Sequence, residues 1–152
     1  MCVTTSRVRR EAVDRHKALH RSCIVCGDGN PRGMKLRFRL AEDGSVVAEV
    51  PCREPWQGYA GVVHGGVISA ILDGAMTHCL FARGTTAVTG ELTVRFVLPV
   101  AVNRNATVRA RVTGAWSPLY KTAAELEQDG RIVARAKAKF VERSNQGDDR
   151  WR

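Results

Sequence analysis

The stretch HGGVISAILDGAMTHCLF, residues 64–81, decides the fold of this chain. Its length and its content of Ala, Leu, Ile and Met favour a helix over a strand, and they predict a helix over 65–82 that Gly84 ends. Such a helix is apolar nearly all round, so the rest of the chain must wrap it. The expected core stripe is Val67, Ile68, Ile71, Leu72, Ala75, Met76 and Cys79.

The segments on both sides of this helix alternate between apolar and polar residues, a pattern typical of half-buried strands. Turn sequences at 42–44 and 128–130 join neighbouring strands into hairpins. The order of strand, strand, helix and four strands indicates an α+β fold with an antiparallel sheet. The expected strands are 34–40, 46–50, 85–98, 106–112, 121–127 and 132–141.

The chain has 152 residues, which fits one domain. We expect a polar N-terminal extension over 1–22, with a possible helix over 5–20, a main domain over 23–143, and a flexible C-terminal tail over 144–152.

The formal net charge is +9, from 24 Lys and Arg against 15 Asp and Glu. This charge favours anionic partners such as nucleic acid, a membrane surface or a phosphorylated small molecule. The basic residues are dispersed, and we see no helix-turn-helix, zinc-finger or RNA-binding signature, so no nucleic-acid partner is expected.

Polar residues interrupt the longest apolar stretch, so no membrane partner is expected either. The N-terminal residues have no apolar segment of the kind that a secretory leader carries. Five cysteines, an odd number, then favour reduced thiols and a cytoplasmic location.

Cys23 and Cys26 have the spacing of a metal or redox pair. His16 and His20 could complete a four-ligand zinc site, although their order is unlike a familiar zinc finger. A redox pair would need a thioredoxin-like setting, which is missing. We prefer the interpretation of two loop cysteines before a strand, and we expect no metal and no cofactor.

Asp73 is the one residue of the predicted helix that carries a formal charge, and a helical wheel places it beside Ser69 and Thr77. A carboxylate in apolar surroundings is costly unless it is paired or used. Burial would raise its pKa, which suits a general base or a nucleophile. The alternative is a structural Asp73 that pairs with an arginine.

Gly65 and Gly66 stand at the predicted start of the helix. They let a ligand approach the backbone, and first-turn N–H groups have no acceptor inside the helix. Such a donor stabilises an oxyanion by about 3 kcal/mol. In the alternative interpretation His64 only caps the helix and the glycines only make a tight turn.

A longer string of motifs resembles a known family. The string is WQGYAGVVHGG at 56–66, Leu72-Asp73, VTGELTVRF at 88–96 and Pro99-Val100, preceded by CIVCG at 23–27 and NPRG at 30–33. Over about residues 23–142 the chain resembles the phenylacetate-pathway-type branch of the hotdog thioesterase superfamily.

The resemblance implies an acyl-CoA thioesterase with a hotdog fold, in which a curved antiparallel sheet wraps a long helix. Two subunits would pair their sheets edge to edge in a homodimer, with further pairing into a homotetramer and with the active site at the dimer interface. Asp73 would attack the thioester or activate water, and Thr89 would position that water or Asp73. His64, Gly65 and Gly66 of the other subunit would hold the carbonyl, with the Gly66 N–H as oxyanion donor. The candidate substrate-binding residues are Gln57, Gly58, Val63, Ser69 and Thr77.

The chain departs from this family pattern at three positions. Gly58 stands where some relatives have Asn, with Gln57 as a possible substitute, and Ala60 stands where proline is usual. Gly74 replaces an acidic residue and should widen the space near Asp73. The alternative function is a non-catalytic hotdog module that binds an acyl or acyl-CoA ligand. A hotdog dehydratase is a third possibility, but it would need a different local motif.

Overall fold

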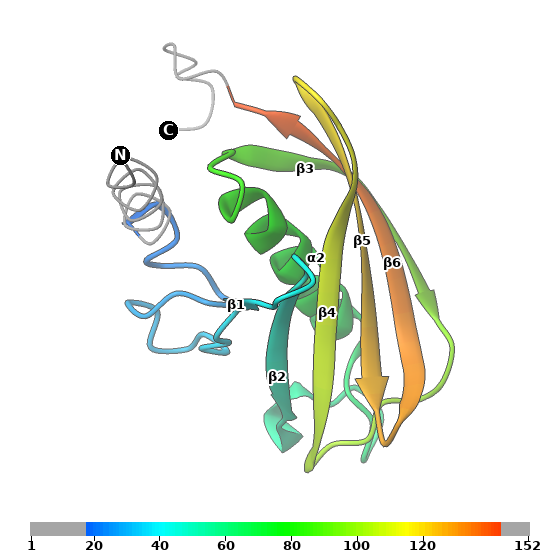
Figure 1. The fold of residues 1–152 in the computed structure, drawn as a ribbon. Helices are drawn as coiled ribbons and strands as arrows, with labels where there is room; N and C mark the ends of the chain where they lie inside the picture. The colour runs from blue at the N-terminus through cyan, green and yellow to red at the C-terminus, as the bar shows by residue number, and fades with distance from the viewer. Residues whose placement is uncertain (1–17, 144–152) are drawn as a thin grey trace.

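The computed structural model describes residues 18–143, which form one helix packed against a six-stranded antiparallel sheet (Figure 1). The sheet order is β1-β2-β4-β5-β6-β3, so β1 and β3 are the edge strands. This arrangement confirms the expected α+β hotdog architecture and the order of its elements. The elements are β1 (Arg39–Leu40), β2 (Val46–Cys52), the 3-10 helix η1 (Glu54–Trp56), α2 (Gly65–Phe81), β3 (Ala87–Phe96), β4 (Arg104–Trp116), β5 (Leu119–Gln128) and β6 (Arg131–Glu142).

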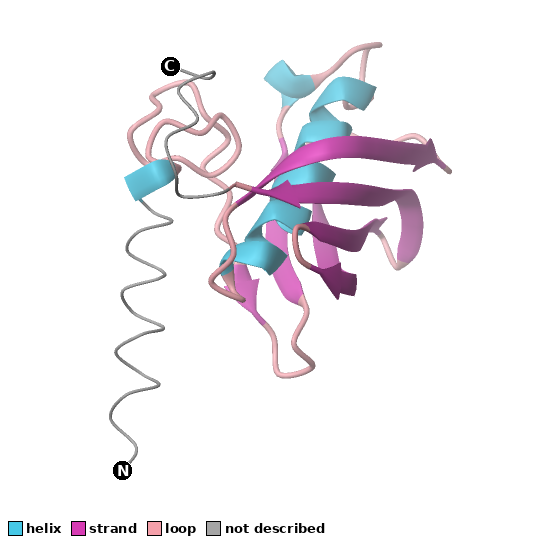
Figure 2. Cartoon of the chain, turned by 90° about the horizontal axis from the view of Figure 1, so that it is seen from above, coloured by secondary structure: helices cyan, strands magenta, loops and turns pink. Residues whose placement is uncertain are grey.

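Helix α2 lies across the inner face of the curved sheet (Figures 1 and 2). Six of the seven residues predicted for its core stripe are buried, and Val67 is partly buried. Each fully buried Leu or Ile side chain stabilises the fold by about 1.5–3 kcal/mol. Thr77, Leu80 and Phe81 are also buried, so the buried surface is wider than one stripe.

Small side chains on the inner face of the sheet let the helix approach closely. Ala106 and Ala110 alternate with exposed residues along β4, and Ala134 and Ala136 do so along β6. Larger side chains such as Phe140 fill the remaining space. On these strands, the apolar residues of the predicted alternating pattern therefore face the helix.

The strand predicted over 34–40 is wrong for most of its length, because only Arg39–Leu40 pairs with β2. Lys35 has a φ of 58°, which an extended strand does not allow. The N–H groups of Met34 and Leu36 instead donate to the carbonyls of Ile24 and Val25. The N-terminal loop therefore satisfies this backbone in place of a neighbouring strand.

Strand β3 forms one edge of the sheet and pairs with β6 on one side only. Its register shifts between Thr89 and Glu91, where two residues of β3 face one residue of β6. Such a bulge bends the strand and re-aims its side chains. Because β3 is long and has an unpaired edge among the described residues, it is a template for pairing with a second chain.

Residues 1–17 and 144–152 lie outside the described part of the chain, and the extension and tail predicted there stay predictions. Of the helix predicted over 5–20, residues 18–20 are described; residues 18 and 19 are helical and His20 lies in a turn. Within 18–143, no helix combines the length and the apolar content of a membrane-crossing segment.

Candidate active site

The carboxylate of Asp73 accepts a hydrogen bond from the hydroxyl of Thr89, with 2.7 Å between Oγ1 and Oδ1. Asp73 lies midway along α2, and Thr89 lies near the start of β3. The β3 bulge follows Thr89 immediately. The structure therefore brings together two residues that are 16 positions apart in the sequence and that were both predicted for the site.

Partial burial raises the pKa of Asp73 above its ordinary value of 3.8, while the Thr89 hydrogen bond and the nearby His20 ring act in the opposite direction. No ion pair within residues 18–143 involves Asp73. The alternative of a structural pair with an arginine is therefore not seen within the described part of the chain. A carboxylate with a raised pKa and one neutral hydrogen-bond donor suits a general base or a nucleophile.

At the helix start, His64 is the N-cap residue, and its Nδ1 accepts a 2.9 Å hydrogen bond from the Gly66 N–H. The capping role suggested for His64 is thus observed. A Cβ on Gly66 would lie 3.0 Å from the same Nδ1, and a Cβ on Gly65 would lie 3.3 Å from the Phe96 ring. A substrate carbonyl would have to share or replace the imidazole acceptor in order to use the Gly66 N–H.

Two predicted substrate-binding residues support the loop before the helix. The side chain of Gln57 accepts a 3.0 Å hydrogen bond from the Gly61 N–H. Gly58 lies against His64, where a Cβ would come within 3.1 Å of the imidazole. Gly58 therefore lets the His64 ring lie close to the loop backbone.

The other three predicted substrate-binding residues pack in the core or form hydrogen bonds within α2 of the same chain. Val63 is buried in the core. Ser69 donates to the carbonyl of Gly65, and Thr77 donates to the backbone carbonyl of Asp73. The Ser69 and Thr77 hydroxyls are thus engaged with carbonyls of their own helix.

One chain does not bring Asp73 and Gly66 together. They are seven residues apart on α2, which corresponds to two turns and a rise of about 10 Å. A thioester carbon within bonding reach of Asp73 would therefore lie far from the Gly66 N–H of the same chain.

The N-terminal loop lies beside Asp73, a neighbour that the hydrophobic pattern of the sequence does not predict. A Cβ on Gly74 would lie 2.8 Å from the Val25 side chain and 3.6 Å from the Phe38 ring. The expectation that Gly74 widens the space near Asp73 is therefore wrong, because the loop fills that space. A glycine in the middle of an apolar helix is itself a signal of close approach by another segment.

The same loop places His20 close enough to influence Asp73, and burial lowers the pKa of this histidine while Asp73 acts against that change. Burial, reinforced by the Cys23 thiol, raises the pKa of Cys26 to about 12. A reactive redox thiol has a lowered pKa, so the redox alternative for this pair is disfavoured.

Comparison with known proteins identifies the family. Residues 60–143, more than half of the chain, match the thioesterase superfamily. The curated human protein acyl-coenzyme A thioesterase 13 is 22% identical over 107 residues, which are 68% of this chain and 76% of that protein.

Solved structures show the same fold. The Escherichia coli PaaI protein of the phenylacetic acid degradation operon has a TM-score of 0.74 and 17% identity, over 90% of this chain and 96% of that one. A hypothetical thioesterase from Streptococcus pneumoniae, solved with coenzyme A, has a TM-score of 0.67 and 17% identity, over 74% of this chain and 88% of that one.

These matches confirm the predicted resemblance and the expectation of a thioester hydrolase. Both the Asp73 helix and strand β3 lie inside the matched region. By fold and by sequence, the chain belongs to the thioesterase superfamily.

Proposed function

We propose that this protein hydrolyses acyl-CoA thioesters to a carboxylic acid and free coenzyme A, with Asp73 as the catalytic carboxylate. The observation that carries the proposal is the hydrogen bond between the partly buried Asp73 and the exposed Thr89, in a chain of the thioesterase superfamily. The name of the human relative, an acyl-coenzyme A thioesterase, supports the substrate class.

The proposed active site is shared between two subunits paired through β3. Thr89 near one end of β3 touches Asp73, and Phe96 at the other end lies against Gly65. If two copies pair antiparallel about a twofold axis near Leu92, Thr89 of one lies opposite Phe96 of the other. Asp73 would then approach Gly66 of the partner subunit. A tetramer built from such dimers stays a prediction.

In the proposed reaction, Asp73 takes a proton from water while the water oxygen forms a bond to the thioester carbon. The carbonyl oxygen becomes an oxyanion, which the Gly66 N–H of the partner subunit stabilises at the positive end of α2. The tetrahedral intermediate then collapses and the carbon–sulfur bond breaks. The departing thiolate takes up the proton held by Asp73. Direct attack by Asp73 through an anhydride is the other route.

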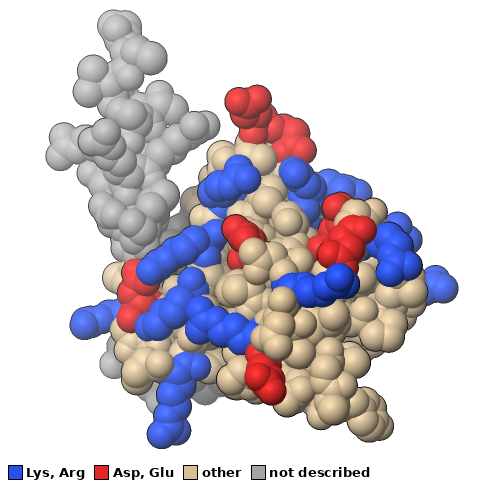
Figure 3. Space-filling model, turned by 90° about the horizontal axis from the view of Figure 1, so that it is seen from below, with Lys and Arg blue, Asp and Glu red and all other residues tan. Residues whose placement is uncertain are grey.

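The positive charge of the chain suits a substrate that carries phosphates. Figure 3 shows one face on which Lys and Arg side chains are more widely spread than Asp and Glu, with both signs present. The net charge of +9 would favour the approach of anionic coenzyme A esters.

The proposal is tested by measuring free-thiol release from short-chain, long-chain and aryl acyl-CoA esters. We expect multiple turnovers with at least one class and none with the matching oxygen ester at the same concentration. Saturable acyl-CoA binding without thiol release from any class would contradict hydrolysis and favour the non-catalytic binding module.

Removing the Thr89 hydroxyl should move the pH profile. The Thr89 hydrogen bond lowers the pKa of Asp73, so Thr89→Val should raise that pKa further. Because a base acts when it is ionised, the acid limb of kcat/KM should move to higher pH, and activity should recover in part at alkaline pH. The control Thr89→Ser keeps the hydroxyl and should keep the profile. An acid limb that stays in place, or moves to lower pH, in Thr89→Val would contradict this role.

A further inference from the structure

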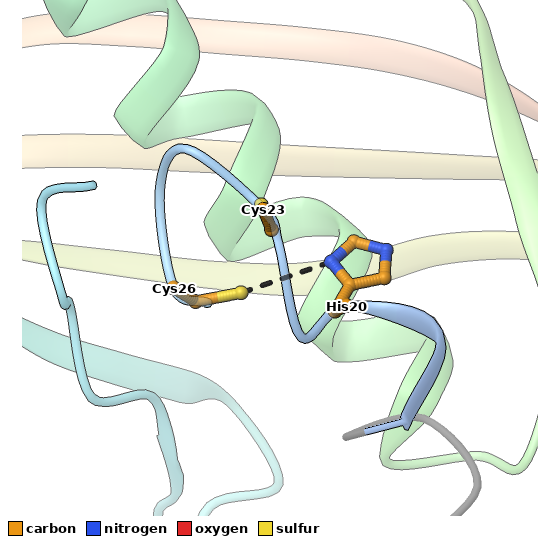
Figure 4. Close-up of side chains that lie close together, drawn as sticks. All are labelled: His20, Cys23 and Cys26. Carbon is orange, nitrogen blue, oxygen red and sulfur yellow. Dashed lines mark hydrogen bonds between the residues drawn. The ribbon is translucent and has the colours of Figure 1, made fainter. Parts of the chain in front are cut away.

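Three metal-ligating side chains of the N-terminal loop converge beside α2 (Figure 4). One donor atom each from His20, Cys23 and Cys26 lies within 4.8 Å of the other two. Nδ1 of His20 lies 3.7 Å from Sγ of Cys26. No other group of His, Cys, Asp or Glu within residues 18–143 is arranged in this way.

The sequence alone favours two loop cysteines without a metal, but the convergence of the three side chains leads us to propose that His20, Cys23 and Cys26 bind a zinc ion. Two sulfur donors and one imidazole are a ligand set that suits Zn²⁺. With Zn–S bonds of about 2.3 Å and Zn–N bonds of about 2.1 Å, the donors of a tetrahedral site lie about 3.5–3.8 Å apart. The His20–Cys26 distance already fits, and a water molecule would take the fourth position.

The backbone of the loop holds the three ligands in place. The Cys23 N–H donates to the His20 carbonyl at 3.0 Å, which ties the first two ligands together. The backbone nitrogen of Val25 lies 3.4 Å from Sγ of Cys23, and its N–H group donates a hydrogen bond to this sulfur. Such a donor stabilises the negative charge of a metal-bound thiolate and orients it.

A tight turn then brings Cys26 back towards Cys23. The Gly27 N–H donates to the Cys23 carbonyl at 2.9 Å. A Cβ on Gly27 would lie 2.4 Å from the Cys23 nitrogen, so no other residue fits without moving the backbone. The ordered turn reduces the conformational entropy that is lost when the ion binds.

The proposed ion would fasten this loop to the helix that carries Asp73. Val25, between the two cysteines, is buried and packs on Gly74. The His20 ring packs edge-on against Phe81, with the centroids 4.6 Å apart. Zinc binding should therefore stabilise the folded chain and hold the loop against α2.

The test uses the full chain, purified under reducing conditions, stripped with a chelator and reloaded with Zn²⁺. We expect elemental analysis to find one equivalent of zinc per chain. Competition with a chromophoric chelator measures the dissociation constant. His20→Ala, Cys23→Ser and Cys26→Ser should each weaken binding by at least about 100-fold. The matched control Cys52→Ala removes a buried thiol outside the cluster and should leave binding unchanged.

A second measurement on the unaltered chain covers the case in which a variant fails to fold. Titration of the stripped protein with Co²⁺ should produce a thiolate-to-cobalt charge-transfer band and the visible bands of a tetrahedral site. Zinc should bleach both and should raise the melting temperature. Absence of the charge-transfer band, or zinc affinity equal in Cys23→Ser and the parent, would overturn the proposal. Neither readout depends on thioester hydrolysis.

Discussion

Asp73→Asn should lower kcat/KM for the best acyl-CoA substrate by about 10²–10⁴-fold, the contribution of a positioned general base. Asparagine has nearly the same shape and can still accept the Thr89 hydrogen bond, so the fold should be kept. Thiol release by the purified variant, with circular dichroism as the check on folding, measures the effect.

The same variant should be more stable than the parent near neutral pH. Burial raises the folded-state pKa of Asp73, so between the unfolded and folded values the folded state binds more protons. Stability from this group is therefore present at low pH and is lost as pH rises through the folded pKa. Asp73→Asn removes that loss, and the melting temperatures of variant and parent should converge as the pH falls towards 3.8.

Asp129→Asn is the matched control for this substitution. Asp129 is a half-exposed carboxylate in a turn with a φ of 53°, a conformation that asparagine tolerates. It should keep full activity. Asp73→Asn with parental turnover would refute Asp73 as the catalytic carboxylate.

Gly66→Pro should lower kcat by about 10²–10³-fold, because it removes the N–H proposed to bind the oxyanion. Proline is tolerated in the first turn of a helix, where the N–H has no acceptor within the helix. The lost hydrogen bond is the cap to His64, so a modest loss of stability of about 1 kcal/mol is also expected.

Gly66→Ala is the matched control, since it adds a Cβ but keeps the N–H. That Cβ would meet only the exposed His64 ring, which would have to shift by a few tenths of an ångström. The activity of Gly66→Ala should stay within about tenfold of the parent. Equal losses in both variants would mean that crowding, and not the missing donor, causes the effect.

Much of the fold could be predicted from hydrophobic periodicity. The helix was predicted over 65–82 and occupies Gly65–Phe81, because apolar residues on nearly all sides require burial. The four strands after it were found in order. The strand over 34–40 could not be judged from alternation alone, since Met34 and Leu36 are buried while their backbone pairs with the N-terminal loop.

The site was predictable only in part. A lone carboxylate on an apolar helix pointed to Asp73, and the family resemblance pointed to Thr89, which the structure places 2.7 Å away. His20 and Val25 lie near Asp73 because the N-terminal loop packs on Gly74. Hydrophobic periodicity carries no information about such packing. In the proposed site, the relation between Asp73 and Gly66 depends on a second copy, which no single chain displays.

Mixing two inactive variants tests the shared site most directly. Asp73→Asn and Gly66→Pro subunits are unfolded and refolded together in equal amounts. Half of the resulting dimers should be heterodimers, each with one intact site. The mixture should regain about a quarter of the parental thiol-release rate, while each variant refolded alone stays inactive. A mixture that stays inactive although heterodimers are shown to form would contradict an active site built from Asp73 of one subunit and Gly66 of its partner.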